Sequence, residues 1–108
     1  MKSVLLIVLN ILACVPVFAS NLPCQRDAEK IVTLILSLEN KRTDIGVEVK
    51  DKKLENSDLG TMIWFDIQGV YLKHGKKSGE LPRTYSHLEF SYENNQCVLA
   101  SYSMPLAN

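Results

Sequence analysis

The stretch that decides the fold is Leu88-Glu-Phe-Ser-Tyr-Glu-Asn-Asn-Gln-Cys-Val-Leu-Ala100. Apolar and polar residues alternate before Asn94, which is typical of a half-buried strand. Asn94-Asn95 suits a two-residue hairpin turn, because asparagine tolerates the positive φ that such turns require. The turn predicts these pairs on one face of the sheet: Tyr92 with Cys97, Phe90 with Leu99, and Leu88 with Ser101. This is the more apolar face, so we expect it to pack on a helix.

That helix is predicted over residues 22–42. Asn21 or Leu22 can serve as its N-cap, and Pro23 suits the first turn. At about 100° per residue, one face becomes apolar. Its members are Cys24, Ala28, Ile31, Val32, Ile35 and Leu38, with Leu34 and Leu36 at its edges. Packing of this face on the sheet is the expected arrangement.

Two cysteines lie on the surfaces that should face each other. Cys24 belongs to the apolar face of the helix, and Cys97 to the helix-facing side of the hairpin. In an oxidising compartment, an even pair of cysteines indicates a disulfide. We therefore expect a Cys24–Cys97 bond.

The remaining segments predict further strands. Ile45, Val47 and Val49 alternate with polar or small residues, and Ile63, Phe65 and Ile67 do the same. After Gly69 the apolar phase changes, which indicates either a β-bulge or a tight Gln68-Gly69 turn. Residues 74–79 should form a turn. The predicted fold class is α+β: one N-terminal helix packed on a four-stranded antiparallel meander sheet (α-β-β-β-β), with one disulfide.

Residues 1–19 have the pattern of a secretory signal peptide, with Lys2, an apolar run and small residues before a cut after Ala19. Residues 20–108 are then expected to form a single small domain, secreted or periplasmic. The run is too short for a transmembrane span, which needs about 20 apolar residues. Ile11-Leu12-Ala13-Cys14 also resembles a bacterial lipobox, so a lipid anchor at Cys14 stays open as an alternative.

Composition and motifs argue against several functions. The chain has 12 basic and 12 acidic residues, and loss of Lys2 leaves a mature charge near −1. This balance argues against a nucleic-acid binder. The sequence lacks Cys-x-x-Cys, His-Glu-x-x-His, Gly-x-Ser-x-Gly and a phosphate-binding glycine loop. Its two histidines are His74 and His87. We therefore expect no metal, no cofactor and no enzymatic activity.

The outer face of the predicted sheet carries the candidate site. The register places Tyr102 beside His87 and Met104 beside Tyr85, and parity adds Met62 and Trp64. The candidate binding face is Trp64, Tyr85, His87 and Tyr102. Aromatic residues of this kind are favoured at binding surfaces. The alternative is that a curved sheet, residues 72–84 or the tail at Pro105 covers this face.

The same face also carries two residues of the kind that an enzyme uses. Asp66 and His87 share it and could hold a general base. A nucleophile is missing, because Ser91 lies about 13 Å along the strand, and Ser101 and Ser103 are expected on the other face. The leading hypothesis is a non-enzymatic module that binds a protein, a small ligand or a second copy in a homodimer. The alternative is a structural or envelope-associated protein.

One helix on four antiparallel strands resembles the cystatin-like architecture. The segment Ile67-Gln68-Gly69-Val70-Tyr71 lacks the inhibitors' Gln-x-Val-x-Gly spacing, and their C-terminal Pro-Trp is absent. Ser78-Gly79 resembles the start of the Ser-Gly-x-x-Tyr loop of bacterial lysozyme inhibitors, but Pro82 stands where the pattern needs tyrosine. No family is assigned on these residues.

Overall fold

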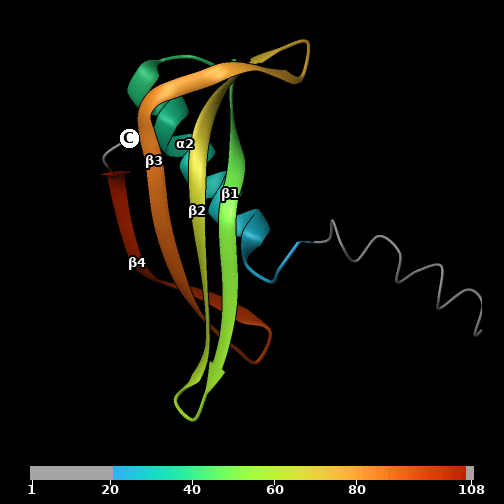
Figure 1. The fold of residues 1–108 in the computed structure, drawn as a ribbon, viewed down its shortest axis with the longest axis vertical. Helices are drawn as coiled ribbons and strands as arrows, with labels where there is room; N and C mark the ends of the chain where they lie inside the picture. Colours follow the sequence, from blue (N-terminus) through green and yellow to red (C-terminus); the bar gives the residue numbers. More distant parts are fainter. Residues whose placement is uncertain (1–20, 107–108) are drawn as a thin grey trace, which may run out of the picture.

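A computed structural model describes residues 21–106, with side-chain positions as far as Met104. One helix, α2 (Gln25–Asn40), lies across one face of an antiparallel sheet (Figure 1). The strands follow in chain order and are neighbours in the same order: β1 (Ile45–Ser57), β2 (Gly60–Lys73), β3 (Lys76–Glu93) and β4 (Gln96–Leu106). The α+β class and the helix packed on an antiparallel meander are confirmed.

The strand pairing differs from the prediction, because β3 pairs with β2 in two separate parts. Gln68 pairs with Tyr85 and Val70 pairs with Glu80, so residues 81–84 have no partner in β2. The Gln68 amide nitrogen bridges this bulge, at 2.8 Å from the Leu81 carbonyl and 3.0 Å from Thr84 Oγ1. The phase change at Gly69 therefore marks a bulge rather than a turn. The extra residues belong to β3, and β2 continues to Lys73.

The core lies between α2 and the inner face of the sheet. On α2 it is formed by Ala28, Val32 and Leu36. On the sheet it is formed by Ile63, Phe65, Ile67, Leu88 and Phe90, all at most 2% exposed. Phe65 and Phe90 meet edge to face, with ring centroids 6.0 Å apart. Alternation along β2 and β3 produces this face, as the sequence predicted.

The helix differs from its prediction in start and orientation. It begins at Gln25 rather than residue 22, because Cys24 has a φ of 71°, outside the helical region. Leu36, expected at the edge of the apolar face, is buried, whereas Leu38 is 68% exposed. The helix is therefore turned so that Ala28, Val32 and Leu36 meet the sheet. Its apolar flank extends beyond the core.

The predicted disulfide is present between Cys24 and Cys97, with Cα atoms 5.7 Å apart. It joins the start of α2 to β4, which lies at the edge of the sheet. The bond closes a sequence separation of 73 residues. The chain-entropy model assigns about 4 kcal/mol to a loop of this size. One covalent bond thus contributes a large part of the stability expected for so small a domain.

The β3–β4 hairpin follows its predicted register only near the turn. Tyr92 pairs with Cys97 and Phe90 with Leu99, but Leu88 pairs with Tyr102 instead of Ser101. Ala100 is an extra residue at this point, because Glu89 pairs with Ser101. A bulge of one residue moves every later side chain of the strand to the opposite face.

The predicted signal peptide, its cut after Ala19 and the lipidation motif at Cys14 lie outside the described residues. Within residues 21–106, no helix is long and apolar enough to cross a membrane.

Candidate binding face

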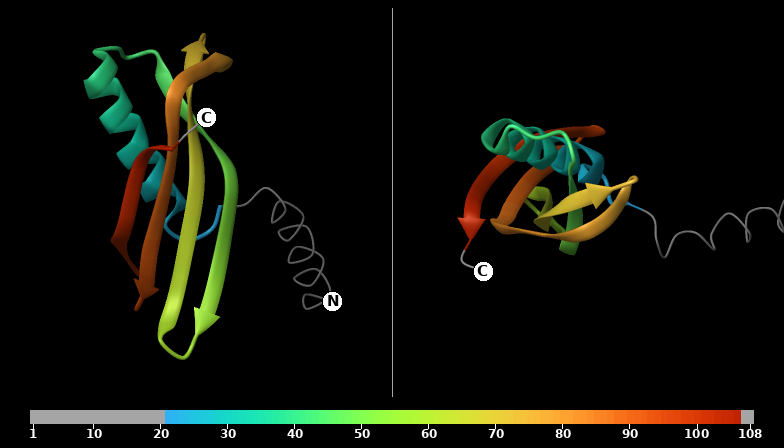
Figure 2. Two further views of the ribbon diagram at one scale, coloured as in Figure 1. Left: turned by 60° about the vertical axis from the view of Figure 1, so that its left-hand side comes forward. Right: turned by 90° about the horizontal axis from the view of Figure 1, so that it is seen from above.

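The described part of the chain packs a helix on only one face of the sheet (Figure 2). The opposite face, called here the outer face, carries the side chains that alternate with the core. Its central part consists of Asp51, Lys53, Met62, Trp64, Asp66, Tyr85, His87, Glu89 and Ser103. Trp64, Tyr85 and His87 are thus brought to the face where the sequence placed them.

Trp64, His87 and Asp66 form a connected cluster at the centre of this face. Asp66 and His87 are direct neighbours across β2 and β3. His87 Nδ1 lies 2.6 Å from Asp66 Oδ1, and its Nε2 lies 3.8 Å from Glu89 Oε2. The Trp64 ring tilts against the imidazole, with centroids 5.6 Å apart. All three side chains are half-buried, so their contacts hold them in place while one side remains open.

Negative charge surrounds this aromatic cluster. Burial raises the pKa of the Tyr85 hydroxyl, and the carboxylates of Asp66 and Asp51 raise it further. Glu89 lies beside Trp64 on β3, and Lys53 lies beside it on β1. The ammonium group of Lys53 is 3.7 Å from the carboxylate of Glu55, which compensates its charge. The centre of the outer face is therefore acidic and aromatic.

Two of these acidic residues were missed by the sequence analysis. Glu89 alternates with Leu88 and Phe90, so strand parity alone was sufficient to place it on the outer face. Asp51 could not be placed in this way, because the register of β1 shifts between Val49 and Asp51. The shift reverses the parity that Ile45, Val47 and Val49 establish.

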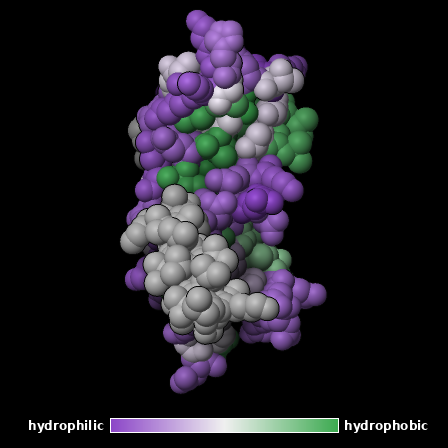
Figure 3. All heavy atoms as spheres, turned by 90° about the vertical axis from the view of Figure 1, so that its right-hand side faces the viewer, coloured by the Kyte–Doolittle hydropathy of each residue, from purple (hydrophilic) through white to green (hydrophobic). Residues whose placement is uncertain are grey.

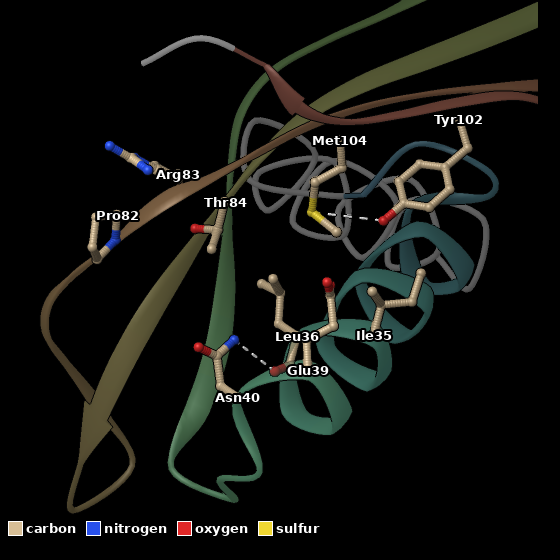
Figure 4. Close-up of a pocket in the computed structure, with 9 residues that line it drawn as sticks. All are labelled: Ile35, Leu36, Glu39, Asn40, Pro82, Arg83, Thr84, Tyr102 and Met104. Carbon is tan, nitrogen blue, oxygen red and sulfur yellow. Dashed lines mark hydrogen bonds between the residues drawn. The ribbon is translucent and has the colours of Figure 1, made fainter.

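Tyr102 does not belong to the outer face, contrary to the prediction. The bulge at Ala100 turns Tyr102 toward α2, with Met104 beside it (Figure 4). The Tyr102 hydroxyl donates to the Met104 sulfur at 3.6 Å, and the Ser86 hydroxyl donates to the same sulfur at 2.8 Å. Burial raises the pKa of Tyr102. Tyr102 and Met104 instead line an open cavity of about 520 Å³ between α2 and the bulge of β3.

The same bulge brings Ser103 to the outer face, opposite His87. Asp66, His87 and Ser103 thus stand in a row across three neighbouring strands, although the sequence analysis placed Ser103 on the other face. Within residues 21–106, however, no hydrogen bond joins Ser103 to His87, and the cavity described above is lined by other residues. Of these three side chains, Asp66 and His87 are in direct contact, and Ser103 is their neighbour on the same face.

A network of four charged side chains lies at one end of the outer face. Lys50 Nζ lies 2.8 Å from Glu48 and 3.0 Å from Glu80, and Lys77 Nζ lies 2.9 Å from Glu48. Hydrogen bonds from the two lysines lower the pKa of Glu48 to about 2. The network links β1 to the first part of β3 and is nearly neutral as a whole. Purple, hydrophilic residues are correspondingly widespread on the β1 side in Figure 3.

Among the described residues, no three histidine, cysteine or acidic side chains are grouped so that they could hold a metal ion. Comparison with protein-family models, with curated proteins and with solved structures finds no match. Any proposal about function therefore depends on the geometry of this chain.

Proposed function

We propose that the protein is a non-enzymatic binding module, secreted or periplasmic, whose outer face binds a basic segment of a partner protein. The observation that supports it most is the Trp64–His87–Asp66 cluster on a face that α2 leaves open. Tryptophan offers the strongest aromatic surface for a cation. Here its ring lies among the carboxylates of Asp66 and Glu89, which attract lysine or arginine side chains.

The strands that hold the cluster favour tight binding. Trp64 and Asp66 lie on β2, the strand with two paired neighbours for most of its length. Their backbones are fixed by hydrogen bonds on both sides, so little conformational entropy remains to be lost on binding. Aromatic anchors in rigid positions are the residues that carry most of the binding energy in protein interfaces.

Trp64 is the only tryptophan of the chain and reports directly on its own surroundings. Titration of the protein with an oligo-arginine peptide should change the fluorescence emission of Trp64 until the binding site is saturated. Glu89→Gln removes a charge next to the indole and should weaken this binding by about tenfold at low salt. Asp58→Asn removes the same charge at the exposed β1–β2 turn and is the matched control. Equal effects of the two substitutions would indicate only a general attraction of the acidic surface.

A further inference from the structure

The two edges of the sheet differ sharply in charge. The edge strand β1 carries six charged residues: Glu48, Lys50, Asp51, Lys52, Lys53 and Glu55. The edge strand β4, from Gln96 to Leu106, carries none. Charged side chains on an edge strand prevent pairing with other chains. Charge therefore protects one edge against pairing and does not protect the other.

Within residues 21–106, the backbone of β4 pairs only with β3. Its other side presents unpaired N–H and C=O groups. Small residues, Ala100 and Ser101, occupy the middle of the strand. Next to them, β4 exposes an apolar side chain on each face of the sheet. Val98 is 59% exposed on the outer face, and Leu99 is 41% exposed on the inner face.

The helix adds an apolar flank on the same side of the molecule. Ile35 lines the cavity together with Tyr102 and Met104, so this side of α2 faces β4 (Figures 2 and 4). At about 100° per residue, Leu38 follows Ile35 round this side of the helix, whereas Leu34 lies on the far side beside Lys30. Leu38 is 68% exposed. The uncharged edge and the apolar flank of the helix thus border one open groove.

We propose that β4 pairs antiparallel with β4 of a second copy of this chain, about a two-fold axis between Leu99 and Ala100, so that Val98 lies opposite Ser101 on the outer face. The axis is perpendicular to the sheet, so both helices lie on the same face of a continuous sheet. The groove between α2 and β4 of each copy then faces that of the other. One contact covers the free edge and brings the exposed Leu38 side chains of the two copies toward each other.

The distribution of charged residues favours β4 of a second copy over β1 of a second copy as the partner of β4. Self-pairing of β4 places no like charges opposite each other, which would weaken a sheet. Pairing of β4 with β1 of another copy would bring six charged residues against an uncharged strand. It would also leave a free β4 at one end and a free β1 at the other, so that the assembly never closed. The two-fold contact leaves only the charged β1 edges exposed.

This contact is separate from the proposed function, because Trp64 lies on β2 and the new contact lies on β4. Sedimentation velocity of the purified protein over a wide concentration range tests it. We expect the mass of two chains. Val98→Lys places two like charges close to the axis and should weaken the dimer by at least about tenfold. Leu38→Lys should also weaken it, whereas Leu59→Lys, at the distant β1–β2 turn, and Trp64→Ser should leave it unchanged.

A single-chain mass at every concentration would overturn the proposal. So would a dimer that Val98→Lys leaves unchanged while circular dichroism shows an intact fold. If Val98→Lys does not fold, amide hydrogen exchange of the unaltered protein takes the place of this variant as the test. Amide protons of β4 should exchange more slowly as concentration rises, while those of β1 should not change. Equal behaviour of the two edges would contradict pairing through β4.

Discussion

Asp66 and His87 stand directly opposite each other on β2 and β3, and the carboxylate oxygen lies 2.6 Å from the imidazole Nδ1. This contact fixes the plane of the imidazole against which the Trp64 ring packs. The outer face therefore has a defined shape at its centre. A defined shape is what separates a binding site from scattered exposed side chains.

The first prediction separates the two aromatic residues that the sequence analysis grouped together. Trp64→Ser removes a half-buried ring from the open face and should lower the free energy of unfolding only modestly. Tyr102→Ser removes a ring packed against the core and should cost more, about 2–4 kcal/mol. Urea unfolding of the two variants measures both values. A larger loss for Trp64→Ser would place the indole, rather than Tyr102, in the stabilising packing.

The second prediction concerns the disulfide. Thiol titration of the denatured protein should find no free sulfhydryl from Cys24 or Cys97. Cys97→Ser should lower the free energy of unfolding by about 2–5 kcal/mol, because the unfolded chain gains freedom when the loop opens. Thermal unfolding of the oxidised protein and of the variant gives this difference. Unchanged stability would mean that the bond contributes little.

The third prediction tests the close approach at Gly69. An added Cβ would lie 2.6 Å from Leu36 Cδ1 and 2.6 Å from Thr84 Oγ1. Gly69→Ala should therefore lower the free energy of unfolding by about 1–3 kcal/mol through overpacking. Gly79→Ala is the control, since its Cβ would have its nearest neighbour at 3.9 Å. Similar results for both glycines would argue against the tight contact between α2 and β2.

The fourth prediction uses the depressed pKa of Glu48. Lys50 and Lys77 lower this pKa from an ordinary value of 4.5 to about 2. The stabilising contribution of the network is thus fully present above pH 4.5 and disappears as the pH falls from there toward 2. NMR titration of the Glu48 side chain should show the low midpoint. Lys77→Met should raise that midpoint, and a midpoint already near 4.5 in the unaltered protein would contradict the network.

Short-range patterns allowed much of this fold to be predicted. Asn94 and Asn95 both have positive φ, as the hairpin requires, and the register next to them is correct. Helix periodicity and strand parity, applied separately, placed Cys24 and Cys97 on facing surfaces. These features depend on residues close together in the sequence.

The errors arise where a single residue shifts the phase. The bulge at Ala100 carries Tyr102 to the helix side and Ser103 to the outer face, and nothing in Leu99-Ala100-Ser101 distinguishes a bulge from regular pairing. The bulge of β3 at residues 81–84 is likewise stabilised by the Gln68 side chain from another strand. Contacts between distant parts of the chain decide such irregularities.

The central claim is that the outer face binds a partner protein at Trp64. The most direct measurement introduces a photo-crosslinking amino acid at Met62, which is exposed on the outer face two residues from Trp64, and illuminates the protein in its native compartment. We expect one partner adduct that disappears with Trp64→Ser. The same group at Leu59, 94% exposed at the β1–β2 turn, should give none. Equal adducts from both positions, or an adduct that Trp64→Ser leaves intact, would contradict binding through the outer face.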